Sequence, residues 1–202
     1  MLRAIKIRLY PNKEQATMFN KLLGCYRVVY NQCLSRKIES YKNDGKSENL
    51  STLGQFVHHE LLKNDNFIWL REQNTKVLKE AVRDMLTAYK NFFERHTGYP
   101  KFESKHDNKQ SCRFELGAIS KRNNYTTYHI SLANIRNVKF RCSEKYAQYL
   151  QKNHDNIRQA TLTKLPCGEY CLSILVDGDL THKVKETNTA VGIDLGIKDF
   201  VV

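Results

Sequence analysis

The chain has 202 residues, of which 41% are hydrophobic, so it can form one or two compact domains with buried cores. Lys and Arg number 33 against 21 Asp and Glu, which gives a formal net charge of +12. This excess is spread along the chain, so it favours a broad basic surface over a disordered tail and makes nucleic acid the leading expected partner. No apolar run approaches the length of a membrane-spanning helix, and the first residues lack the apolar core of a signal peptide, so no membrane association is expected.

The cysteines are widely spaced, and none forms a C-x-x-C pair. Without a secretory signal, this spacing predicts reduced thiols in a cytoplasmic protein. Cys167 and Cys171 flank a turn and would meet if the turn closed a hairpin. A metal site there is not expected, because no second pair or suitably spaced histidine accompanies them.

Residues 3–10 alternate between apolar and mostly basic side chains, which predicts a strand with one buried face and one basic face. Asn12 followed by Gln15 has the spacing of a capping box, so a helix is expected to begin there. Apolar residues recur at helical spacing as far as Leu34. Gly24 interrupts this pattern and would mark either a close helix crossing or a break.

Two further helices are expected, over residues 51–63 and 74–94. His58 and His59 are neighbours in the first of them and should face different directions, which is a poor arrangement for sharing a metal. The second helix has an apolar stripe and a separate, mostly basic stripe that suits a phosphate backbone. A merely solvated face is the alternative. The basic stripe consists of Lys76, Lys79, Arg83, Thr87 and Lys90.

The character of the sequence changes after Gly98. Short alternating runs predict five strands, with a short helix over residues 143–152 between the third and the fourth. Together with the strand at 3–10, they would suffice for a small barrel or a strongly twisted sheet, with the earlier helices inserted between the first two strands. The five predicted strands cover residues 111–116, 125–132, 137–141, 158–165 and 169–176.

Residues 190–202 contain a last distinctive pattern. Apolar residues alternate there with Gly192, Asp194 and Gly196, which predicts a strand whose polar face carries one uncrowded carboxylate. Such a carboxylate suits Mg²⁺ and a phosphate group. On the local pattern alone, a strand that ends in an Asp-Gly turn is favoured over a metal ligand. A single aspartate also cannot hold a catalytic metal pair by itself.

Several segments together resemble the transposon-encoded RNA-guided nucleases called TnpB or OrfB, relatives of the type V CRISPR effectors. They occur in the order of that family and run from one end of the chain to the other. The matching segments are IRLYP (7–11), GCYRVVYN (24–31), WL (69–70), AYKNFF (88–93), GYPKF (98–102) and GIDLGIK (192–198).

The resemblance implies an α+β fold: an OB-like wedge β-barrel with a helical recognition insert, followed by the first strand of an RNase H-like (RuvC) nuclease domain. The wedge and the insert would hold a guide RNA and read a short motif beside a DNA target. Such insert regions are also described as helix-turn-helix, but the alternation before Pro11 favours a strand followed by an insert. The implied parts are 1–11 (first barrel strand), 12–96 (insert), 97–177 (rest of the barrel), 178–189 (linker) and 190–202 (start of RuvC).

The resemblance also assigns residues. Asp194 matches the first RuvC carboxylate, which would bind Mg²⁺ in the complete nuclease, and this makes the metal-ligand interpretation the favoured one. Gln55, Thr75 and Lys79 fall in regions that look like the motif-reading surface. With the cations of the long helix, the expected nucleic-acid-binding residues are Gln55, Thr75, Lys76, Lys79, Arg83 and Lys90.

In this family the other catalytic carboxylates and a four-cysteine zinc module follow the first RuvC strand, so here they would lie beyond Val202. We therefore expect a chain of 202 residues to be inactive in cleavage on its own. Two alternatives remain at this point: a non-catalytic derivative that binds DNA or RNA, and a decaying transposon remnant.

Overall fold

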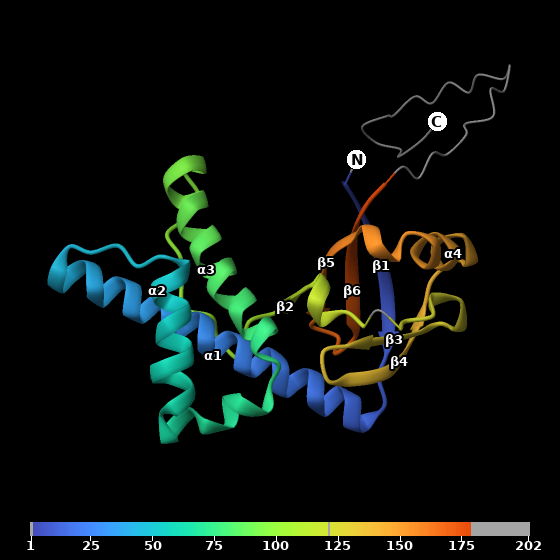
Figure 1. The fold of residues 1–202 in the computed structure, drawn as a ribbon, viewed down its shortest axis with the longest axis horizontal. Helices are drawn as coiled ribbons and strands as arrows, with labels where there is room; N and C mark the ends of the chain where they lie inside the picture. Colours follow the sequence, from blue (N-terminus) through green and yellow to red (C-terminus); the bar gives the residue numbers. More distant parts are fainter. Residues whose placement is uncertain (1, 121, 179–202) are drawn as a thin grey trace, which may run out of the picture.

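A computed structural model describes residues 2–120 and 122–178 of the chain. A group of helices lies beside an antiparallel sheet, which confirms the predicted α+β class (Figure 1). The strands are β1 (Leu2–Tyr10), β2 (Gln110–Glu115), β3 (His129–Leu132), β4 (Ile135–Arg141), β5 (Ile157–Lys164) and β6 (Tyr170–Asp177). The α-helices are α1 (Lys13–Asp44), α2 (Leu50–Gln55), α3 (Thr75–Arg95) and α4 (Glu144–Lys152).

Short helical turns complete the described chain. One is a π-turn, η1 (Phe56–Glu60), which continues directly from α2. The others are 3₁₀ turns: η2 (Leu61–Lys63), η3 (Asp65–Glu72), η4 (Leu116–Ala118), η5 (Tyr125–Thr127) and η6 (His154–Asn156). The helix predicted over 51–63 is therefore a succession of α, π and 3₁₀ turns.

The sheet has the strand order β2-β5-β6-β1-β4-β3, and every neighbouring pair is antiparallel. The predicted insertion of helices between the first two strands is confirmed, because α1, α2 and α3 all lie between β1 and β2 in the chain. The sheet curls until the segment after β2 meets β3. There Ser120 N donates to Ser131 O over 3.2 Å, and Ala133 N donates to Ala118 O.

Strand β1 lies inside the sheet, between β6 and β4. Its apolar side chains Ile5, Ile7 and Leu9 are buried, while Lys6 and Arg8 are exposed. This is the expected consequence of alternation along a pleated strand with one covered face. The first strand therefore forms as its sequence predicts.

Helix α1 begins with the predicted capping box. Asn12 Oδ1 accepts from Gln15 N over 2.8 Å, and Asn12 N donates to the Gln15 side chain over 2.9 Å. The helix continues through Gly24 without a break, and nothing lies close enough there to mark a helix crossing. It ends at Gly45, which has a left-handed φ of 64° and donates to Tyr41 O.

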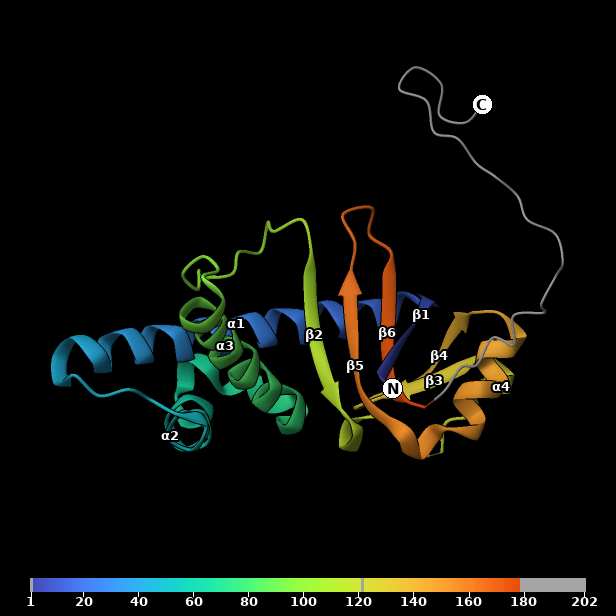
Figure 2. The same ribbon diagram turned by 90° about the horizontal axis from the view of Figure 1, so that it is seen from above.

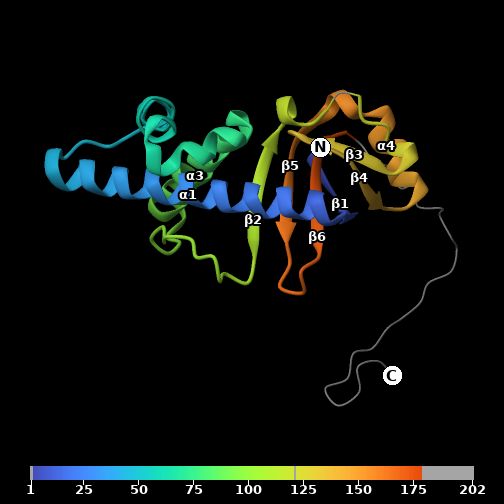
Figure 3. The same ribbon diagram turned by 90° about the horizontal axis from the view of Figure 1, so that it is seen from below.

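Helix α1 joins the two parts of the molecule, because it extends from the helical group along the sheet (Figures 2 and 3). Its first half is fixed to the sheet by polar contacts. Gln15 Nε2 donates to Arg136 O over 2.9 Å, and Asn20 Oδ1 accepts from Lys164 Nζ and the Tyr170 hydroxyl. Its second half packs against α3, whose buried residues run from Val77 to Tyr89. The apolar stripe was predicted to continue to Phe93, but the structure leaves Phe92 half-buried and Phe93 exposed.

One predicted strand is shorter than expected. The strand predicted over 125–132 begins only at His129, because residues 125–127 form a 3₁₀ turn and Tyr128 adopts a left-handed φ of 56°. All six cysteines are free thiols, and Cys167 is exposed while Cys171 is buried.

Across residues 2–120 and 122–178, no helix combines the length and apolar character needed to cross a membrane.

Candidate nucleic-acid interface

A groove of about 690 Å³ lies between α2 with its π-turn η1 and the first half of α3. Aliphatic side chains line part of it, among them Val57, Leu62 and Leu78. Polar and basic side chains complete its lining, from Ser51 on α2 to Lys79 on α3. The groove therefore combines an apolar surface with hydrogen-bonding and cationic groups, the combination found in sites that bind organic ligands and nucleic acids.

Four of the six residues predicted to bind nucleic acid line this groove: Gln55, Thr75, Lys76 and Lys79. All four are exposed. Gln55 comes from α2 and the other three from the first turns of α3, so the fold brings together residues about twenty positions apart.

The two lysines at the groove keep their ammonium groups available for a ligand. Lys76 Nζ lies 3.5 Å from the Gly117 carbonyl, at the limit of a hydrogen bond. Within the described part of the chain, the Lys79 ammonium has no carboxylate partner. Asn74 caps α3 by accepting from Lys76 N over 3.0 Å, so the positive end of the helix dipole faces the same region as the two lysines.

His58 and His59 also line the groove, and sequence reasoning missed them as candidates. Their rings stack, with centroids 5.0 Å apart and an interplanar angle of 19°. The expectation that they face different directions is therefore wrong. They lie in the π-turn η1, whose wider hydrogen-bonded ring departs from α-helical spacing, and nothing in the local sequence predicts such a turn.

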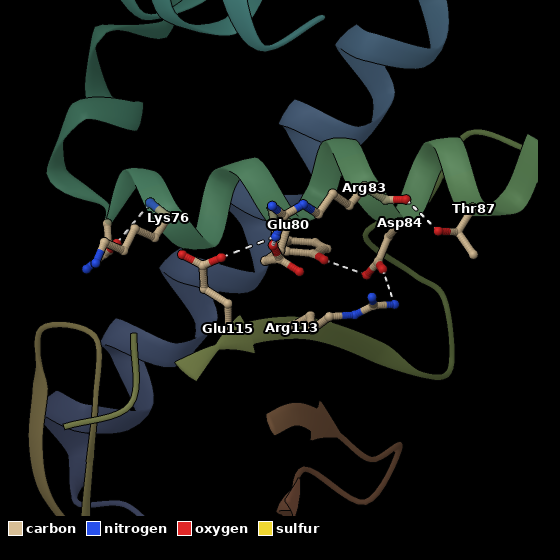
Figure 4. Close-up of polar contacts among 9 residues, drawn as sticks. Lys76, Glu80, Arg83, Asp84, Thr87, Arg113 and Glu115 are labelled. Carbon is tan, nitrogen blue, oxygen red and sulfur yellow. Dashed lines mark hydrogen bonds and ion pairs between the residues drawn. The ribbon is translucent and has the colours of Figure 1, made fainter. Parts of the chain in front are cut away.

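Arg83 and Lys90 lie apart from the groove, although both belong to the predicted basic stripe of α3. The Arg83 guanidinium pairs with Glu80, whose side chain is 4% exposed, and with Glu115 of β2 at 3.2 Å (Figure 4). A buried carboxylate needs a cationic partner, so Arg83 stabilises the fold by neutralising Glu80. Lys90 is about 16 Å further along the helix than Lys79 and lies 3.8 Å from Glu94.

A second polar cluster, on the same helix, joins three elements. The Tyr26 hydroxyl on α1 donates to Asp84 Oδ2 on α3 over 2.5 Å, and Arg113 of β2 forms an ion pair with Asp84 Oδ1 (Figure 4). Burial raises the pKa of the Asp84 carboxyl, while the hydrogen bond from Tyr26 and the charge of Arg113 oppose the rise. The cluster holds α3, and with it one wall of the groove, in a fixed position relative to the sheet.

The outer face of the sheet carries a further set of cations that sequence reasoning did not assign to a site. Arg8 of β1 faces Arg141 of β4 directly, and the next pair on the same face of the sheet is Tyr10 and Lys139. Like charges that face each other across strands are unfavourable. Arg8 is neutralised by Glu169 and lies 5.1 Å from the Tyr10 ring centroid, whereas Arg141 is exposed. The sequence signal that could have indicated this cationic surface was the basic face of residues 3–10. The pairing of β1 with β4 adds the cations of β4 to the same surface.

The predicted metal ligand Asp194, the proposed linker and the proposed RuvC strand lie outside the described residues, apart from Gly178. Among residues 2–120 and 122–178, no three His, Cys, Asp or Glu side chains gather in a way that could hold a metal ion. The Mg²⁺ site and the zinc module therefore stay predictions.

A family model described as a helix-turn-helix domain (HTH_OrfB_IS605) matches residues 1–46. Of these, residues 2–46 form strand β1 and the single helix α1, with Gly45 and Lys46 after it. A solved structure of a CRISPR-Cas12f ternary complex is also similar, with 14% identity and a TM-score of 0.44 over 93% of this chain and 46% of the matched chain.

Curated relatives match more of the chain. A Streptomyces pristinaespiralis protein, provisionally named an RNA-guided DNA endonuclease, is 27% identical over 98% of this chain and 47% of its own length. InsQ of Escherichia coli K12, provisionally named in the same way, is 23% identical over 97% of this chain and 46% of its own length. The virulence protein VsdF of Salmonella dublin is 31% identical over 52% of this chain and 96% of its own length.

The chain thus spans about half the length of the first two relatives. The family match, the relatives and the ordered sequence segments agree with one another. The chain belongs to the TnpB/OrfB family.

Proposed function

We propose that this chain is the N-terminal, nucleic-acid-binding part of a transposon-associated RNA-guided DNA endonuclease, with the groove as its contact to duplex DNA. The observation that carries the proposal is the convergence of Gln55, Thr75, Lys76 and Lys79 on one groove from two separate segments. Two exposed lysines, a side-chain amide and a hydroxyl, beside a helix N-terminus, are the groups that bind phosphates and base edges.

The groups of the groove divide into two tasks. Lys76 and Lys79 each neutralise a phosphate, which contributes affinity without regard to sequence. Gln55 and Thr75 donate to and accept from base edges, which contributes sequence preference. In this proposal the groove reads the short motif beside the DNA target, and the exposed cations of β4, Lys139 and Arg141, contact the backbone of a guide RNA.

The finer architecture also belongs to this proposal. The curled sheet of β1 to β6 corresponds to the OB-like wedge barrel (1–11 and 97–177), and α1 to α3 correspond to the recognition insert (12–96). Residues 178–189 would be the linker and 190–202 the start of the RuvC domain. Mg²⁺ held there, in part by Asp194, would activate water against a DNA phosphodiester.

The groove is tested by duplex binding as a function of salt. Lys76→Gln/Lys79→Gln should weaken the binding of a random-sequence DNA duplex and lower the slope of log K against log salt by about 1.8, or about 0.9 per phosphate contact. Fluorescence anisotropy over a salt series measures both quantities. The matched control is Lys42→Gln/Lys63→Gln, which removes two lysines that do not line the groove and should change the slope by less. An unchanged slope in the Lys76/Lys79 variant would exclude the groove.

Sequence preference is tested separately. Gln55→Ala and Thr75→Ala should alter which duplexes are enriched from a pool with randomised positions, while the salt slope stays that of the wild type. The same enrichment profile in wild type and variants would show that these side chains do not read bases.

The metal assignment has its own test, in a chain extended through a complete nuclease domain. Asp194→Ala should abolish Mg²⁺-dependent cleavage of the targeted DNA and leave guide-dependent binding intact. Cleavage that survives this substitution would remove Asp194 from the catalytic site.

A further inference from the structure

Aromatic side chains gather at the C-terminal end of α3 and in the segment that leads from it to β2. The Phe92 ring centroid lies 5.0 Å from that of Phe93 and 5.3 Å from that of Tyr99, and Tyr99 packs edge-on against Tyr89 at 5.5 Å. Phe93 is 70% exposed and Tyr99 is 46% exposed. Phe92, Phe93 and Tyr99 are called the aromatic ledge below.

Hydrogen bonds fix the segment that carries Tyr99 to the neighbouring helices. The Tyr89 and Tyr99 hydroxyls are 2.7 Å apart and share a hydrogen bond. Further along the segment, the Asn31 side chain of α1 accepts from Glu103 N over 2.8 Å and donates to Glu103 O over 2.9 Å. These bonds fix the segment to α1 and α3, so the rings are exposed on a preorganised surface. A ligand would meet them without a large ordering cost.

Cations flank the aromatic ledge in the sequence. Lys90, Arg95 and Lys101 are exposed near it in the sequence, and within the described part of the chain Arg95 and Lys101 have no ion-pair partner. Exposed rings interleaved with free cations are typical of surfaces that bind single-stranded nucleic acid, where bases stack on the rings and phosphates meet the cations.

We propose that the aromatic ledge is a second, distinct site that stacks unpaired nucleobases of a single-stranded RNA or DNA segment. In a duplex the base faces are covered by neighbouring bases, so the ledge and the groove would bind different forms of nucleic acid. A second copy of this chain is a poorer occupant, because its own cations would face those around the ledge. This inference rests on the proposed function for the class of ligand, but not on the groove.

The test compares two probes on the intact chain: a labelled single-stranded 15-mer of U or dT and a labelled duplex. Phe93→Ala should weaken single-strand binding roughly 5- to 150-fold, the range for the loss of one stacked base, and leave duplex binding within about twofold of wild type. Phe93→Trp should retain single-strand binding, because it keeps an aromatic face. The matched control is Trp69→Ala in η3, an exposed aromatic that precedes the opposite end of α3, and it should bind both probes as wild type does.

The outcomes separate the two proposals. If Phe93→Ala binds the single strand with the affinity of wild type, the proposal for the aromatic ledge is wrong. The proposal for the groove is then still supported if duplex binding depends on Lys76 and Lys79. If wild type binds neither probe, both proposals fail. If Phe93→Ala and Phe93→Trp weaken binding equally, an aromatic face is not what the ligand uses, and the stacking proposal falls. Unfolding midpoints equal to wild type confirm that each variant is folded.

Discussion

The Tyr26 hydroxyl offers a sharp test of how the helical group is fixed to the sheet. Tyr26→Phe removes the donor to Asp84 and leaves the ring, which is 2% exposed, in place. A hydrogen bond to a charged group contributes about 1.5–3 kcal/mol to stability. The Asp84 side chain is 27% exposed, so water replaces part of the lost bond. We therefore expect a loss of about 1.5–2 kcal/mol in the free energy of unfolding near neutral pH.

The loss should depend on pH. Burial raises the pKa of Asp84 in the folded state, and the Tyr26 hydrogen bond opposes that rise, so Tyr26→Phe raises it further. The hydroxyl stabilises the ionised carboxylate. The folded-state pKa of Asp84 is therefore higher in Tyr26→Phe than in wild type. Above both pKa values the hydroxyl makes its full contribution to stability. That contribution is lost as the pH falls below the pKa in the variant and then below the pKa in wild type. The difference between wild type and variant should therefore shrink in acid.

Urea denaturation from about pH 7.5 to about pH 4.5, followed by circular dichroism, measures this difference. Tyr30→Phe is the matched control, because Tyr30 is a buried tyrosine one turn later on α1. Within the described part of the chain its hydroxyl has no hydrogen bond. A loss in Tyr26→Phe that is equal to the control, or that stays constant over the pH range, would refute the role given to the Asp84 cluster.

Three further outcomes are expected. A thiol reagent at mildly alkaline pH should label the exposed Cys167 quickly in the native protein. Cys25 and Cys33 should react only on unfolding, because burial raises their pKa values to about 11 and about 12. Rapid labelling of either buried thiol would contradict this. Asn12→Ala should lower the free energy of unfolding by about 1 kcal/mol through loss of the α1 cap. Gly45→Ala should lower it by about 1 kcal/mol because φ is 64° there; the urea midpoint checks both substitutions.

Most elements of the fold follow from local patterns. The alternation of residues 3–10, the capping box at Asn12 and the apolar stripe of 74–94 each predict the element that forms, because each depends on side chains within a few residues. The predicted strand over 125–132 failed because Asn124 caps a 3₁₀ turn and Tyr128 takes a left-handed conformation. Hydrophobic periodicity does not report such a change of backbone conformation.

The candidate site was predictable in part for a related reason. The groove residues on α3 follow from one helix face, but the separation of Arg83 from them depends on Glu115, which comes from another strand. The facing pair of Arg8 and Arg141 depends on the register between β1 and β4, more than a hundred residues apart. Charge patterns within one element are visible in a sequence, whereas the partners that neutralise or reinforce them come from tertiary structure.

The position of β1 also determines the order in which the protein can be completed during synthesis. The first strand made pairs with β4 and with β6, and β6 ends only at Asp177. At about 5–20 residues per second, a ribosome needs about 9–35 s to produce that stretch. Until residue 141 is made, β1 has neither neighbour, and it lacks β6 until residue 177 is made, while the helices that follow β1 emerge much earlier. The proposed nucleic-acid-binding groove is therefore translated before the sheet beside it can close, and the edge of β1 that faces β6 stays unpaired in the nascent chain throughout that interval.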